Sequence, residues 1–168
     1  MLNKKGYSII ELLIVIAIIG LIFELSLSFY KNNNVNDFIN DDIYLLKTNI
    51  IKIENMTNSG QSDVKFSENN NYGIYLDTNN KNNYLLYKDS NLNNHYDASE
   101  AFETVKIDNS SINSLSSGST MDLLFNANGD VYLNNAQTFL TNINISFIYK
   151  TSIKNIYINS LTKTINIQ

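Results

Sequence analysis

Five side chains that could bind a cation through oxygen atoms lie close together in the middle of the sequence. They are Asp89, Asn91, Asn93, Asp97 and Glu100. Calcium prefers carboxylate, amide and carbonyl oxygens as ligands. The three carboxylates of this segment could neutralise the ion, and the peptide carbonyl of His95 could add a further oxygen. The segment from residue 89 to residue 100 is therefore a candidate calcium site.

The spacing of these oxygen atoms is more specific than their number. They fall at positions 1, 3, 5, 9 and 12, as in an EF-hand calcium loop. Asn94 stands where that motif has glycine, but asparagine also tolerates the left-handed backbone. The alternative is an ordinary turn, because turns are rich in Asp and Asn and this chain is rich in Asn throughout. Both interpretations stay open, and no cofactor is certain.

Other kinds of site find little support in the composition. The 168 residues include no cysteine and one histidine, so the sequence offers no zinc site and no Ser-His-Asp triad. We expect His95 to be a solvated loop residue and the protein not to be an enzyme. The formal charge is −4, and clustered basic surface is confined to Lys150, Lys154 and Lys163. Nucleic acid is therefore an unlikely partner.

The amino terminus combines a basic start with an apolar run. Lys4 and Lys5 precede Gly6, and residues 12–23 contain no polar side chain. A secretory signal peptide has a similar start, but small residues suited to its cleavage site are scarce here. A plain membrane anchor would not favour Glu11, since a carboxylate in hydrocarbon is costly. The two lysines place the amino terminus in the cytoplasm and the rest of the chain outside it.

A third interpretation uses all of these features. The stretch Lys5-Gly6-Tyr7-Ser8-Ile9-Ile10-Glu11-Leu12-Leu13-Ile14-Val15 resembles the class III leader of type IV pilins and pseudopilins. The resemblance implies that prepilin peptidase cuts between Gly6 and Tyr7 and that the new amino group of Tyr7 is methylated. It also implies that Glu11 pairs with the terminal amine of a neighbouring subunit during filament assembly. The signal-peptide and plain-anchor interpretations remain open beside it.

The helix is expected to continue beyond the apolar run. Residues Val35, Phe38 or Ile39, Ile43, Leu46, Ile50 and Ile53 recur at steps of three and four, which predicts an amphipathic helix. A bend or melted turn is expected at residues 32–34, and a helix stop near Met56. The predicted organisation is a leader at 1–6, a membrane and assembly helix at 7–30, its amphipathic continuation at 31–57 and a globular β domain at 61–168.

Short runs rich in Ile, Tyr, Val and Phe follow residue 60 and predict strands. Their ranges are 64–66, 72–76, 84–88, 102–107, 121–125, 131–133, 143–149, 153–158 and 162–167. Asn128-Gly129 predicts a hairpin turn, since both residues tolerate positive φ. The fold class is α+β, a long amino-terminal helix packed on an antiparallel sheet, as in pilins. Phe125 to Gly129 also resembles the Phe-x-x-x-Gly hairpin of the H-type (GspH/FimT) minor pseudopilins.

The expected function is structural. The resemblance implies a subunit, minor rather than major, of a type IV pilus or a type II secretion pseudopilus. Its partners would be other pilin or pseudopilin subunits, prepilin peptidase and the inner membrane, with the globular domain outside the cytoplasm. Two alternatives remain: a filament-tip module that serves DNA uptake or adhesion, and a membrane-anchored extracytoplasmic β-domain.

Overall fold

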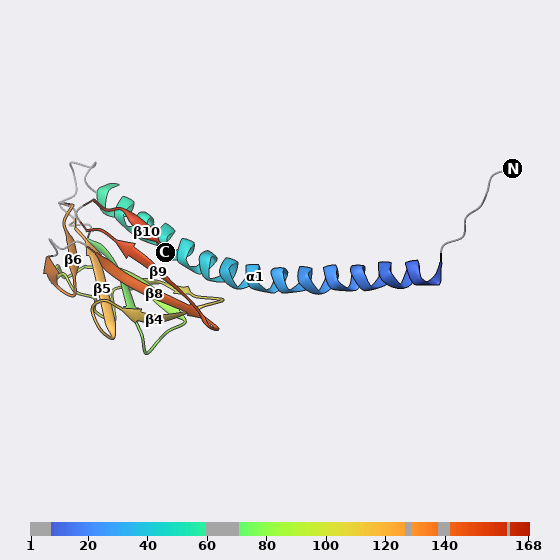
Figure 1. The fold of residues 1–168 in the computed structure, drawn as a ribbon. Coiled ribbons are helices and arrows are strands. Elements are labelled where there is room, and N and C mark those ends of the chain that lie inside the picture. Colours follow the sequence, from blue (N-terminus) through green and yellow to red (C-terminus); the bar gives the residue numbers. More distant parts are fainter. Residues whose placement is uncertain (1–7, 60–70, 127–128, 138–141, 161) are drawn as a thin grey trace. The chain divides into compact units, whose positions relative to one another are not determined.

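The computed structural model describes residues 8–59, 71–126, 129–137, 142–160 and 162–168. For residues 28–36 it describes the backbone alone. These residues form one α-helix and ten strands. The chain divides into two compact units, residues 1–37 and residues 38–168. The predicted α+β class, a helix followed by antiparallel sheet, is confirmed (Figure 1).

The single helix α1 spans Ile9–Ser59. Residues 32–34 are helical, so the turn that their asparagines were expected to melt is intact. Asparagine lowers helix propensity only by a fraction of a kcal/mol, about 0.7 at most. Three such residues therefore do not interrupt a helix that is apolar on both sides of them. The predicted stop near Met56 lies within one turn of the observed end.

Ten strands form two antiparallel sheets in the globular unit. The first sheet has the order β3-β2-β1-β5-β6-β7 and the second the order β10-β9-β8-β4 (Figure 1). Their bounds are β1 Tyr72–Asp77, β2 Asn83–Lys88, β3 Ala101–Lys106, β4 Ser111–Leu115, β5 Thr120–Phe125, β6 Val131–Leu133, β7 Ala136–Gln137, β8 Ile143–Tyr149, β9 Ser152–Ile158 and β10 Ile165–Ile167.

Most of the predicted strands are confirmed to within about one residue. The prediction over 162–167 was too long at its start, and the one over 64–66 lies outside the described residues. Two strands were not predicted. The residues of β4, Ser-Ile-Asn-Ser-Leu, lack a clear apolar run, and β7 has two residues. The predicted hairpin is confirmed by the pairing of Phe125 with Val131, and Gly129 has φ of 85°. Asn128, the other residue of the predicted turn, lies outside the described residues.

The core of the globular unit joins α1 to both sheets. Ile39, Ile43, Leu46, Ile50 and Ile53 are at most 2% exposed, which confirms the predicted amphipathic stripe. They belong to one cluster with residues of both sheets, such as Leu76, Leu123 and Phe147. Full burial of each such side chain contributes about 1.5–3 kcal/mol. The stripe is therefore the main source of stability for the packing of the sheets on the helix.

A buried carboxylate on α1 holds the turn that leads into β4. Asp42 is 4% exposed, and its oxygens accept hydrogen bonds from the peptide N–H groups of Asp108, Asn109 and Ser110 at 3.3, 3.1 and 2.6 Å. The Ser110 hydroxyl donates to the same carboxylate at 2.7 Å. These bonds fix where the chain passes from the first sheet to the second.

Replacement of Asp42 by alanine is expected to lower the free energy of unfolding by about 3 kcal/mol, because the buried N–H and hydroxyl of Ser110 lose their acceptor. Urea unfolding of the full chain in detergent micelles, followed by tyrosine fluorescence, measures the loss. Asp41→Ala is the matched control, because Asp41 is the neighbouring carboxylate and is exposed. Equal effects of the two substitutions would contradict this role of Asp42.

Candidate functional site

The start of α1 is defined by Ser8 and Glu11. The peptide N–H of Ser8 donates to Glu11 Oε2 at 2.8 Å, and the Ile10 N–H donates to Ser8 Oγ at 3.4 Å. The Ser8 carbonyl accepts from the N–H groups of Glu11 and Leu12. Ser-x-x-Glu with these bonds is a capping box, in which Ser8 is the N-cap residue. Gly6 and Tyr7, the predicted cleavage and methylation residues, lie outside the described residues.

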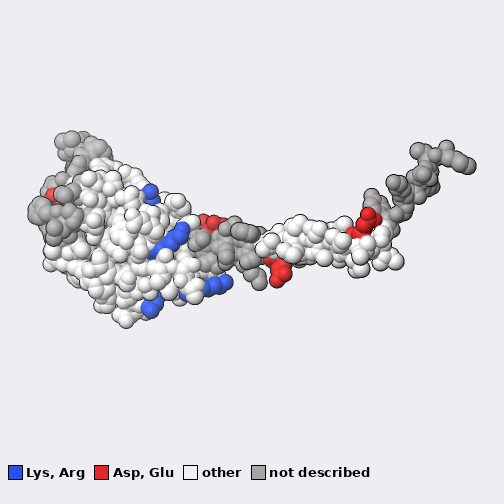
Figure 2. Space-filling view, viewed as in Figure 1, with Lys and Arg blue, Asp and Glu red and all other residues white. Residues whose placement is uncertain are grey.

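The first part of α1 leaves its apolar side chains uncovered. One stretch in the described residues, Ile9–Leu27, is long and apolar enough to cross a membrane by length and composition. Its 19 residues extend about 29 Å at ~1.5 Å each, close to the ~30 Å hydrocarbon core. Every large apolar side chain in it is at least 48% exposed. Figure 2 shows this surface as almost uncharged, so it requires lipid or other protein around it.

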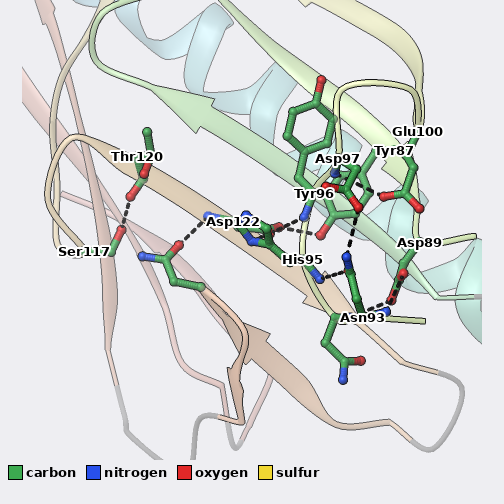
Figure 3. A network of polar contacts seen from close by, with 12 residues as sticks. Tyr87, Asp89, Asn93, His95, Tyr96, Asp97, Glu100, Ser117, Thr120 and Asp122 are labelled. Carbon is green, nitrogen blue, oxygen red and sulfur yellow. Dashed lines mark hydrogen bonds and ion pairs between the residues drawn. The ribbon is translucent and has the colours of Figure 1, made fainter. Parts of the chain in front are cut away.

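The segment from Asp89 to Glu100 is closed by hydrogen bonds from its own backbone (Figure 3). The Asp89 carboxylate accepts from the N–H groups of Asn93 and Asn94, at 3.1 and 3.0 Å. Glu100 accepts from the Ser90 N–H at 2.8 Å and from the Asp97 N–H at 3.2 Å. Asn94 has φ of 58°, the left-handed conformation that its position in the motif requires. The segment is thus a well-defined loop between β2 and β3.

The side-chain amides of Asn91 and Asn93 both donate to Asp97 Oδ2, at 2.7 and 2.9 Å. Across the described part of the chain, which includes this whole loop, no three His, Cys, Asp or Glu residues are grouped to hold a metal ion. The oxygens of the loop face N–H groups instead. Calcium at Asp89, Asn91, Asn93, His95, Asp97 and Glu100 stays a prediction.

Isothermal titration of the full chain in micelles tests that prediction. Binding should give heat at or below millimolar calcium, because three carboxylates would exchange N–H donors for a divalent ion. Asp97→Asn should weaken this binding, since the change removes one negative charge from the ligand set. The absence of heat at millimolar calcium would end the calcium interpretation, and the loop would then be a structural turn.

A buried carboxylate beneath this loop was not singled out from the sequence. Asp122 lies on β5 and is 2% exposed. Its Oδ1 accepts from the Tyr87 hydroxyl, and its Oδ2 accepts from the Tyr96 N–H at 2.6 Å (Figure 3). Nδ1 of His95 lies 2.9 Å from the same Oδ2. The signal was present in the sequence, because a single Asp inside the apolar strand 121–125 must find partners on burial.

His95 is therefore not only the solvated loop residue that was expected. Its side chain is 50% exposed, yet it forms an ion pair with Asp122 when the imidazole is protonated. Tyr96 stacks on Tyr75 with ring centroids 4.5 Å apart and meets Tyr87 edge to face. These contacts fasten the loop to the face of the first sheet that lies opposite the main core.

The Tyr87 side chain reaches Asp122 by crossing over β1. Gly73 pairs with Tyr87 across β1 and β2, and a Cβ atom on Gly73 would collide with the Tyr87 ring. Burial raises the pKa of Tyr87 above its ordinary range, and the negative charge of Asp122 adds to that effect. Tyr87 is therefore a neutral hydroxyl donor at any physiological pH.

Burial raises the pKa of Asp122 above its ordinary value of 3.8, although the bonds from Tyr87, Tyr96 and His95 oppose this effect. A raised folded-state pKa means that folding favours the protonated form. This carboxyl group therefore contributes stability below pH 3.8 that is lost as the pH rises through the folded-state pKa. A folded-state pKa that is higher by one corresponds to a loss of about 1.4 kcal/mol.

The difference in unfolding free energy between the wild type and Asp122→Asn should thus favour the wild type most at low pH. It should decline as the pH rises. Urea unfolding in micelles between acid and neutral pH gives the profile. The same pair of proteins in a His95→Gln background removes the ion pair between His95 and Asp122. A difference that grows with pH would contradict the raised pKa of Asp122.

Two of the three lysines that were considered for nucleic acid have partners on α1. Lys154 Nζ donates to Asn40 Oδ1 at 2.8 Å, and Lys163 Nζ lies 3.3 Å from Glu54 Oε1. Lys150 lies over the ring of the adjacent Tyr149. Two of the three ammonium groups are thus held against α1, one from β9 and one from the segment between β9 and β10.

Comparison with known proteins gives one result, at the amino terminus. Residues 1–23 match the family described as the prokaryotic N-terminal methylation motif. No curated protein and no solved structure matches the chain. The match supports a type IV pilin-like protein that prepilin peptidase processes, and the exposed apolar helix is consistent with a membrane-anchored pilin. The chain therefore carries the prokaryotic N-terminal methylation motif of the type IV pilins and pseudopilins.

Proposed function

We propose that the protein is a structural, non-enzymatic subunit of a type IV pilus or type II secretion pseudopilus. The observation that carries the proposal is the methylation motif at residues 1–23, which overlaps an uncovered apolar helix. Such a surface has no stable place in water. The exposed apolar surface supports residence of the subunit in the inner membrane, followed by burial among the helices of neighbouring subunits.

The proposed sequence of events begins with membrane insertion. Lys4 and Lys5 stay on the cytoplasmic side, and the unit from Phe38 onward lies on the other side. Prepilin peptidase then cuts between Gly6 and Tyr7, and the amine of Tyr7 is methylated. The cut removes both lysines and creates a positive charge four residues before Glu11.

Glu11 is the proposed assembly residue. Glu11 and Glu24 are the only carboxylates of the apolar stretch Ile9–Leu27, and a carboxylate in a core of packed apolar helices needs a partner. The terminal amine of a neighbouring subunit is a partner of opposite charge. Their pairing would fix the axial position of each new subunit against the previous one.

A minor position in the filament is the finer part of the proposal. The β5–β6 hairpin, with Phe125 paired to Val131, resembles the H-type minor pseudopilins. The closing hairpin of β9 and β10 is also similar to the carboxyl end of that group. Sheared filaments from cells that carry the neighbouring pilus or secretion genes should then contain this chain as a small fraction of the total subunits.

Substitution of Glu11 by glutamine is expected to reduce incorporation into filaments at least about tenfold. Loss of one partner of a buried ion pair costs several kcal/mol, about 3–5. Immunoblots of sheared filaments measure incorporation, and mass spectrometry of the membrane fraction should find chains that begin at methylated Tyr7. Glu24→Gln is the matched control on the same helix and should assemble. Normal assembly of Glu11→Gln would refute the pairing.

A further inference from the structure

The carboxylate of Glu11 already has a partner within its own chain. The Ser8 N–H donates to Glu11 Oε2 at 2.8 Å, three residues away. Glu24, the other carboxylate of the apolar stretch, has no hydrogen-bond partner among the described residues. The two glutamates therefore differ in their local hydrogen bonding.

We propose that Ser8 is a positioning residue that holds Glu11 on its own helix until the subunit assembles. This inference rests on the proposed function as a filament subunit. In the unassembled subunit, the carboxylate lies near the start of the apolar stretch of α1, where an unpaired charge is costly. The capping box pairs the carboxylate locally, so the subunit can stay in the membrane before assembly without an unpaired Glu11 side chain.

The geometry of the helix start makes Ser8 suited to this task. As the N-cap residue, Ser8 uses its carbonyl to accept from the N–H groups of Glu11 and Leu12, at 3.0 and 3.2 Å. Its own N–H precedes the first helical hydrogen bond and has no acceptor on the helix backbone. Glu11 supplies that acceptor, and the positive end of the helix dipole favours the negative charge there.

Processing places a competing donor next to this bond. The cut between Gly6 and Tyr7 would create an ammonium group one residue before Ser8. An ammonium group binds a carboxylate more strongly than a peptide N–H does. Assembly would then exchange a neutral donor for a charged one of the neighbouring subunit. Glu11 is paired before and after this exchange, which lowers the cost of joining the filament.

Hydrogen exchange of the Ser8 amide tests the capping box directly. The full-length unprocessed chain, labelled with nitrogen-15, is studied by NMR in detergent micelles as wild type, Glu11→Ala and Glu11→Gln. Loss of a helix cap typically accelerates opening of the first turn about fivefold. The Ser8 amide should exchange about fivefold faster in Glu11→Ala. In Glu11→Gln it should keep its protection, since glutamine also completes a capping box.

Glu24→Ala is the control and should leave the Ser8 amide unchanged. Amides in the middle of α1, such as that of Ile18, report whether each variant keeps its helix. Equal exchange of the Ser8 amide in the wild type and Glu11→Ala would overturn the proposal. That result is distinct from failure of the proposed function, which would appear as a wild-type chain that is not cut at Gly6 or does not enter filaments.

The two readouts also separate a capping role from a charge role. Glu11→Gln should retain the protected Ser8 amide and still fail to assemble, because glutamine accepts the hydrogen bond but carries no charge. Glu11→Ala should lose both the protection of the Ser8 amide and assembly into filaments. Substitution of Ser8 by threonine, another good N-cap residue, should preserve the protected amide and assembly, whereas loss of protection in Ser8→Thr would contradict the role of Ser8 as the cap.

Discussion

Burial of one isoleucine-rich face of α1 is the interaction on which the globular unit depends. Ile39, Ile43, Ile50 and their neighbours are almost completely buried, and residues of both sheets belong to the same cluster. The polar contacts of the helix lie around this face. Asn49 donates to the Tyr84 hydroxyl at 2.7 Å, and Thr57 donates to the Phe125 carbonyl. Without the apolar face, neither sheet would have a surface to pack on, and these polar groups would have no fixed partners.

The same helix has opposite surroundings in its two parts. From Phe38 onward, its apolar face is covered by the chain itself. Between Ile9 and Leu27, none of this apolar surface is buried among the described residues. When a protein buries the apolar surface of a helix over only part of its length, a membrane or other subunits must cover the part that stays exposed. This incomplete burial, together with the methylation motif at residues 1–23, is the physical basis for the proposed role in assembly.

Periodicity alone predicted the helix face and most of the strands, because both depend on apolar side chains at regular intervals. It could not predict β4, where polar residues occupy a strand that is held by β8 and by Asp42 on the helix. The loop from Asp89 to Glu100 was identified by its oxygen atoms. Its attachment to Asp122 could not be predicted, since Tyr96 and Asp122 lie 26 residues apart and meet only after the sheet has formed. The capping box at Ser8 was readable in principle, as Ser-x-x-Glu before an apolar run.

Tyr87 and Gly73 have a consequence for how the chain reaches this structure. The phenol ring lies in the space that the absent side chain of Gly73 leaves free. If β1 and β2 paired two residues out of step, the ring would face Asn71 or Tyr75 in place of Gly73, and a side chain would occupy that space. Misaligned hairpins would therefore pack poorly and revert. Gly73 thus favours the native register of β1 and β2 during folding.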